Sequence, residues 1–102
     1  MDASDGEKPL LSAESVPADD APWFEIARFA RTFNAFDFHG SFQAVGEIAN
    51  QRRRGTLVDL RTCLFFEQRR WNHFGSEPDE EALAYIRSII REIRERVAVG
   101  LP

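Results

Sequence analysis

Asp37, His39 and Ser41 lie within five residues of one another and are of the types that hydrolases use. A serine nucleophile needs an imidazole base and an acid that orients that base. Ser41 is better explained as the N-cap of a following helix and Asp37 as a turn residue, because no glycine-flanked nucleophile or oxyanion motif accompanies them. We therefore predict no catalytic residues and a protein that is not an enzyme.

Cys63 and His73 are the residues that suggest a metal site. On one continuous helix, however, ten residues separate them by about 15 Å, so they cannot share one ion. Cys63 is the only cysteine, which excludes a multi-cysteine zinc site and an internal disulfide. We expect no metal and no cofactor, and we interpret the pair as a buried thiol and a partly exposed imidazole.

Glu67 is the one carboxylate that helical spacing places within an apolar face, between Cys63, Leu64 and Trp71. A buried carboxylate needs a partner. The favoured interpretation is a salt bridge with an arginine of another helix, such as Arg28 or Arg31. The alternative is a binding or acid/base group with a raised pKa, which would require a cleft around Glu67.

Arginines are concentrated between residues 51 and 70, where six of them face two acids. Nucleic-acid binding is therefore an alternative function, with phosphate contacts from Arg52, Arg53, Arg54 and Arg61. The helix that would enter a groove begins with apolar residues that cannot read base edges. We favour arginines that complete a helix dipole and pair with acids such as Glu47 or those of the N-terminal tail.

Aromatic residues are more abundant than a domain of this size normally hides, with nine Phe and two Trp in 102 residues. Exposed aromatic rings beside arginines are typical of protein interfaces. The leading hypothesis is a non-enzymatic adaptor or regulatory module that binds a protein partner, or a second copy of itself, through the helix over 56–74 and the aromatic loop from Phe36 to Phe42. The alternative is a monomer whose aromatic core is fully buried. The expected contact residues are Phe36, Phe38, Phe66, Arg69, Arg70 and Trp71.

The elements that must position these residues follow from apolar periodicity and capping residues, which predict an all-α fold. We expect a compact four-helix domain over 21–102, with helices at about 22–34, 41–54, 56–74 and 77–98. Residues 35–40 are predicted to be a loop. The helix over 56–74 has apolar residues on several sides, so it is either central to the domain or covered by a second molecule. Gly46 within the second helix predicts a close helix crossing.

The first 20 residues hold six acids against Lys8 alone and have few large apolar side chains. We predict a disordered acidic tail over 1–20, which either only keeps the protein soluble or folds back on the arginines. Residues 21–102 are nearly neutral, with eleven acids and twelve arginines. No stretch is apolar enough for a membrane span or a signal peptide, so we expect no membrane contact and a cytoplasmic protein.

Overall fold

The computed structural model describes residues 11–102, which form an all-helical domain without strands. The elements are a short 3-10 helix η1 (Ala13–Ser15) and the helices α1 (Trp23–Ala30), α2 (Ala35–His39), α3 (Phe42–Asn50), α4 (Leu57–Phe74) and α5 (Glu80–Val99). The four predicted helices are confirmed. No helix of the described residues is both long and apolar enough to cross a bilayer.

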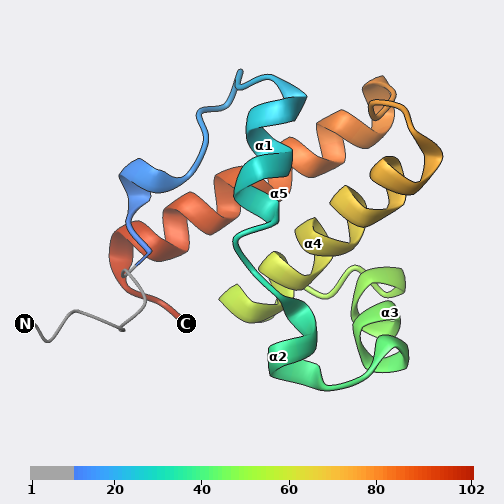
Figure 1. Ribbon diagram of the computed structural model, residues 1–102. Coiled ribbons are helices and arrows are strands. Elements are labelled where there is room, and N and C mark those ends of the chain that lie inside the picture. Colours follow the sequence, from blue (N-terminus) through green and yellow to red (C-terminus); the bar gives the residue numbers. More distant parts are fainter. Residues whose placement is uncertain (1–10) are drawn as a thin grey trace, which may run out of the picture.

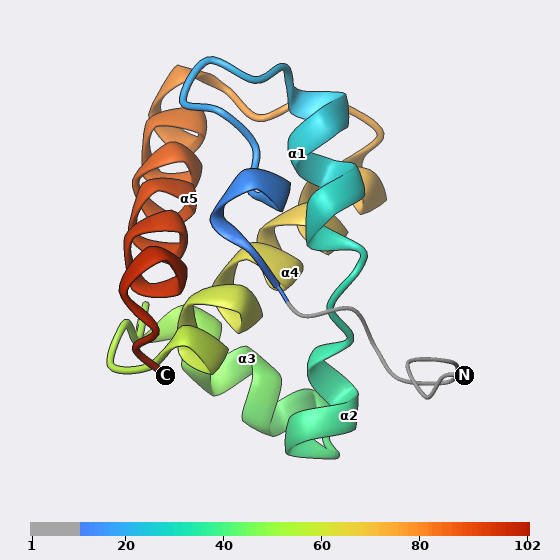
Figure 2. The same ribbon diagram turned by 90° about the vertical axis from the view of Figure 1, so that its left-hand side faces the viewer.

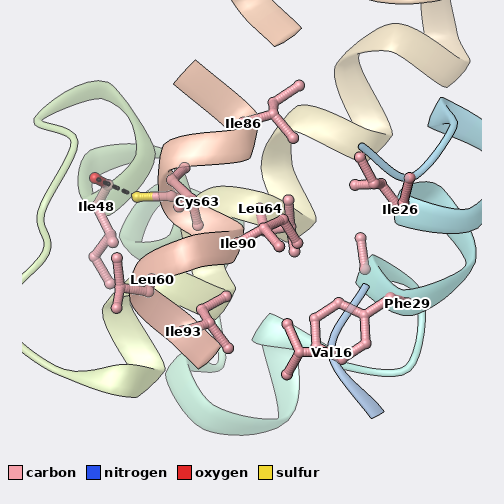
Figure 3. Packing of buried hydrophobic residues seen from close by; sticks show 13 residues of the cluster. Val16, Ile26, Phe29, Ile48, Leu60, Cys63, Leu64, Ile86, Ile90 and Ile93 are labelled. Atoms are coloured by element: carbon pink, nitrogen blue, oxygen red, sulfur yellow. Dashed lines mark hydrogen bonds between the residues drawn. The ribbon is translucent and has the colours of Figure 1, made fainter. Parts of the chain in front are cut away.

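Helix α4 is the central element, with α5, α1, α3 and α2 packed around it (Figure 1). Its many-sided apolar pattern is explained by two clusters of buried residues that meet it from different directions. The larger cluster joins α4 to α1 and α5 and includes Leu60, Leu64, Ile26, Ile86 and Ile90 (Figure 3). The smaller cluster joins α4 to α2 and α3 through Phe33, Ala35, Val45 and Phe65. The protein's own fold thus covers both apolar sides of α4.

The predicted loop over 35–40 is wrong, because residues 35–39 form helix α2. The first helix ends at Ala30 rather than near residue 34, and Asn34 then caps α2 by accepting a hydrogen bond from the Phe36 amide (3.1 Å). Gly40 ends α2 with a left-handed backbone (φ 75°). Asn34 and Gly40 together are the sequence features that mark this short helix.

The second predicted helix extends too far, since α3 ends at Asn50. Arg52 adopts a left-handed conformation (φ 51°), and the Arg53 amide donates to the Ile48 carbonyl (3.1 Å), which closes the helix. Arg52, Arg53 and Arg54 therefore lie in a loop and not in a last helical turn. The last helix begins at Glu80 rather than near residue 77, because Asp79 is its N-cap.

The first ten residues of the predicted disordered tail over 1–20 lie outside the described residues, and the prediction is wrong for residues 11–20, which pack on the domain. This segment lies between α1 and α5 (Figure 2). Val16 is only 6% exposed within the larger cluster. Asp19 pairs with Arg94 of α5 at 2.8 Å. The buried Val16, the ion pairs of Asp19 with Arg94 and Arg91, and the hydrogen bond from Arg94 to the Pro17 carbonyl hold a segment whose composition alone indicates a polar tail.

Candidate functional site

The two short helices α2 and α3 place the rings of Phe36 and Phe42 near Phe66 of α4. Helix α2 ends at Gly40, and Ser41 immediately caps α3 by accepting a hydrogen bond from the Ala44 amide (3.0 Å). This tight turn brings Phe36 of α2 next to Phe42, the first residue of α3, with ring centroids 6.3 Å apart. The predicted N-cap role of Ser41 is confirmed.

Phe36, Phe42 and Phe66, together with Arg69 and Arg70, form what we call the aromatic surface. The Phe42 ring lies 6.5 Å from that of Phe66 on α4 and remains 64% exposed. Phe36 and Phe66 are half-buried against the smaller cluster. Helices α2 and α3, which contribute Phe36 and Phe42, lie next to each other on one side of α4 in Figure 1. The result is a contiguous apolar patch from three elements rather than a single exposed ring.

Two exposed arginines stand at the α4 side of this patch. The Arg69 guanidinium lies 5.5 Å from the centre of the Phe36 ring, and that of Arg70 lies 5.7 Å from the centre of the Phe66 ring. Both distances fit cation–π contacts. Among residues 11–102, no carboxylate pairs with Arg69, whereas Arg70 lies 3.9 Å from Glu67. The rim of the patch therefore carries positive charge.

Two of the residues predicted to bind a partner lie elsewhere. Phe38 is 56% exposed, but its ring stacks on Phe33 at 4.8 Å and not on the aromatic surface. Trp71 packs against the larger cluster and lines a separate cavity of about 340 Å³ with Trp23 and Phe24. The structure thus groups four of the six predicted contact residues: Phe36, Phe66, Arg69 and Arg70.

Glu67 is buried as expected, at 7% exposure, but the predicted pairing with Arg28 or Arg31 is wrong. Its carboxylate accepts a hydrogen bond from Trp71 Nε1 (3.2 Å) and lies 3.9 Å from Arg70 Nη1. Both partners belong to α4 itself, at i+4 and i+3. Glu67 thereby links the Arg70 side of the aromatic surface to the packing of Trp71.

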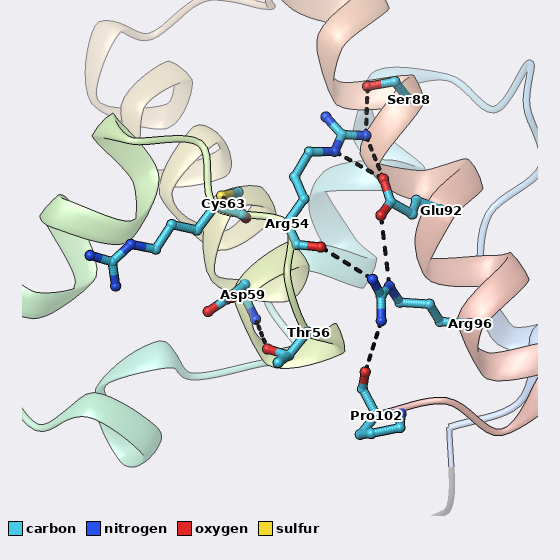
Figure 4. Close-up of polar contacts among 9 residues, drawn as sticks. Arg54, Thr56, Asp59, Cys63, Ser88, Glu92, Arg96 and Pro102 are labelled. Atoms are coloured by element: carbon cyan, nitrogen blue, oxygen red, sulfur yellow. Dashed lines mark hydrogen bonds and ion pairs between the residues drawn. The ribbon is translucent and has the colours of Figure 1, made fainter.

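Two of the loop arginines, Arg52 and Arg54, contact helix α5. Arg54 donates from Nε to Glu92 (2.9 Å) and from Nη2 to Ser88 (3.3 Å), and its carbonyl accepts from Arg96 (3.2 Å), as Figure 4 shows. The guanidinium of Arg52 lies 4.3 Å from the centre of the Tyr85 ring, also on α5. These contacts hold the α3–α4 loop against α5.

Arg61 lies on a different side of α4, half-buried between α1 and α4. It donates to Thr32 Oγ1 (3.3 Å), its guanidinium stands 4.6 Å from the centre of the Phe33 ring, and burial lowers its pKa. It lines an open groove of about 1100 Å³ beside the N-terminal segment. Arg53 is exposed and pairs with Gln51 (2.9 Å). The four arginines predicted to contact phosphates therefore have partners on different elements and do not form one cluster.

Three residues that suggested a hydrolase or a metal site, namely Asp37, His39 and Cys63, each have a separate partner. His39 Nε2 is 3.2 Å from Thr62 Oγ1, while Asp37 accepts a hydrogen bond from the Asn34 side chain (3.3 Å). Cys63 is buried, which raises the pKa of its thiol, and donates to the Arg53 carbonyl (3.4 Å). Within residues 11–102, no three His, Cys, Asp or Glu side chains gather closely enough to hold a metal ion.

Phe42 ends the aromatic loop that the sequence hypothesis placed at the interface, but it was not among the individual contact residues expected there. A residue directly after the Ser41 N-cap lies in the first turn of a helix, where an apolar side chain is compatible with burial. Only the packing of α2 against α3 leaves its ring outside. Comparisons with family models, with curated proteins and with solved structures find no match to this chain.

Proposed function

We propose that this protein is a non-enzymatic interaction module that binds a protein partner through the aromatic surface. The observation that carries this proposal is the Phe42 ring, which is 64% exposed although two further Phe rings lie beside it. Isolated exposed apolar side chains are ordinary, but a contiguous apolar patch with a polar rim is typical of interaction sites.

The composition of the aromatic surface supports the same proposal. Phe and Arg are enriched at protein interfaces, and the residues that dominate binding energy are aromatic rings and arginines at the centre of such patches. The stacked rings and cation–π contacts also hold the side chains in place, which reduces the entropy that binding costs. A partner would thus meet a largely preformed surface.

The proposal is tested by photo-crosslinking in cells that produce the protein. Phe42 is replaced by the photoreactive analogue p-benzoylphenylalanine, and the matched control carries the analogue at Glu81, an exposed position on α5. We expect a protein adduct of defined mass from position 42 and none from position 81. Equal adducts from both positions, or none from position 42, would contradict the proposal.

Nucleic-acid binding through Arg52, Arg53, Arg54 and Arg61 is the alternative proposal, and it has less support. Arg52 and Arg54 contact α5, and Arg61 contacts Phe29 of α1 and the following Thr32, so only Arg53 has its guanidinium away from other helices. Binding of a DNA or RNA duplex that weakens steeply with salt and depends on these arginines would favour this alternative.

A further inference from the structure

We infer that the partner's contact segment is an amphipathic α-helix whose apolar stripe is flanked by carboxylates, docked over Phe42, Gly46 and Phe66 with its acids toward Arg69 and Arg70. This inference rests on the proposed function and specifies the chemistry of the partner. Three observations carry it: the position of Gly46, the sign of the charge at the rim, and the all-helical construction of the surface.

Gly46 lies one turn after Phe42 on α3, on the same side of the helix. The close helix crossing predicted from this glycine is wrong, since a Cβ added to Gly46 would meet no atom within 4 Å. Its backbone is helical and has no positive φ, so neither packing nor conformation within the domain requires glycine. Glycine inside a helix nevertheless costs about 1 kcal/mol relative to alanine. A partner helix that approaches this turn closely would occupy the space that a side chain at Gly46 would otherwise fill.

The rim charge selects an acidic partner. Phe66, Arg69 and Arg70 lie at i, i+3 and i+4 on α4 and therefore share one side of the helix, with the Arg70 guanidinium beside the Phe66 ring and that of Arg69 beside the Phe36 ring. Arg69 has no carboxylate partner among the described residues, and the single contact of Arg70 with Glu67 is long at 3.9 Å. A partner carboxylate can therefore pair with Arg69 without displacing an existing ion pair, which gives specificity and a faster encounter.

The construction of the surface favours a helix over an extended segment. The surface consists of helix side chains, and the described residues contain no strand whose edge could pair with an extended peptide. A bound segment must then satisfy its own backbone hydrogen bonds, as a helix does. A second copy of this chain is a poorer fit, because a two-fold contact would bring the arginines of both aromatic surfaces to one interface.

The inference is tested with labelled helical peptides of about 18 residues, long enough to form a helix once bound. The three peptides share one leucine stripe, and their flanking positions carry Glu, Gln or Lys. Fluorescence anisotropy with the full chain is expected to show the Glu peptide binding roughly tenfold more tightly than the Gln peptide, and the Lys peptide most weakly. The preference should shrink as salt rises from about 0.05 to about 0.5 M.

Variants connect this preference to the named residues. Arg69→Gln with Arg70→Gln should abolish the preference for Glu over Gln, whereas Arg28→Gln removes the same type of charge from α1 and should leave it intact. Gly46→Leu should weaken binding of the Glu peptide at least about tenfold, and Gly46→Ala by a smaller but measurable factor, because the alanine methyl already occupies part of the space that the inference assigns to the partner. Circular dichroism spectra and thermal unfolding curves of each variant serve as controls for correct folding.

The failure of this inference is distinguishable from the failure of the proposed function. Equal affinity for the three peptides, no binding of any, or unchanged binding by Gly46→Leu overturns the inference, even if position 42 crosslinks to a protein. A position 42 adduct with twice the mass of the chain, together with a dimer in sedimentation, overturns it in favour of a second copy. Loss of the crosslink itself removes the proposed function.

Discussion

Two phenylalanines of the same aromatic neighbourhood should differ sharply in their contribution to stability. Phe65 is 7% exposed within the smaller cluster, whereas Phe42 is 64% exposed. Complete burial of a Phe side chain is worth about 1.5–3 kcal/mol, so the third of Phe42 that is covered contributes roughly 0.5–1 kcal/mol. Phe65→Ala loses nearly the whole of that burial and leaves a cavity, for a total of about 3–5 kcal/mol.

Urea unfolding followed by circular dichroism measures both free energies. With a denaturant slope of about 1 kcal/mol/M for a chain of this size, Phe42→Ala should lower the midpoint by about 0.5–1 M. Phe65→Ala should lower it by about 3 M or more, or leave the protein unfolded, since the whole domain is worth only about 5–15 kcal/mol. The unfolding of the unaltered chain should not depend on protein concentration.

Comparable losses in the two variants would refute the reasoning. If Phe42→Ala cost as much as Phe65→Ala, the Phe42 ring would be buried in solution, either by the domain itself or by a second copy. Repeating the measurement at a tenfold lower protein concentration separates these cases, because only burial by a second copy weakens on dilution.

Three further predictions concern α3, the buried thiol and the N-terminal segment. Gly46→Ala should raise the free energy of unfolding by about 0.5–1 kcal/mol, measured by urea unfolding, and a loss of stability would mean that the space beside Gly46 is filled. Cys63 is 1% exposed with a raised pKa, so iodoacetamide at pH 8 should alkylate it at least about tenfold more slowly in the folded protein than in urea; equal rates would contradict its burial. The hydrogen bond from Arg94 holds the pKa of Asp19 below its ordinary value of 3.8, so this contribution to stability is present above that pH and lost as pH falls through the lowered pKa. Asp19→Asn should therefore be less stable than the unaltered chain at pH 6, this difference should shrink as pH falls below 3.8, and a constant difference in the free energy of unfolding would refute the linkage.

The fold class could be predicted because its determinants are local. Periodic apolar residues and side-chain caps fix where a helix forms. Ser41 caps α3 as expected, 3.0 Å from the Ala44 amide, and Thr56 caps α4 in the same way, 3.1 Å from the Asp59 amide. The predicted end of helix α3 was wrong because the chain turns there at a residue other than glycine. Arg52 ends α3 in a left-handed conformation that sequence reasoning assigns to glycine, and its guanidinium meets Tyr85 from a distant part of the chain.

The partners of the charged side chains of Glu67 and Asp19 were not predicted either. The burial of Glu67 followed from its place among apolar residues, but its partners depend on which neighbours reach it. Arg70 and Trp71 of the same helix do so, whereas Arg28 lies on α1 beside the Phe24 ring and Arg31 directly follows α1. Likewise, Asp19 pairs with Arg94, which is 75 residues away in the sequence. The burial of Val16 in the larger cluster places this segment beside α5.

The sequence by itself determined that residues 21–102 form helices, that α4 has more than one apolar side, and that Phe and Arg are concentrated around it. These properties depend on residue type and spacing within about two helical turns. Only the tertiary structure decided that α2 and α3 cover the second apolar side of α4, and that this packing buries Phe65 while it leaves Phe42 outside. The physical reason is that exposure depends on how separate helices meet, and contacts between distant segments are not encoded in local periodicity.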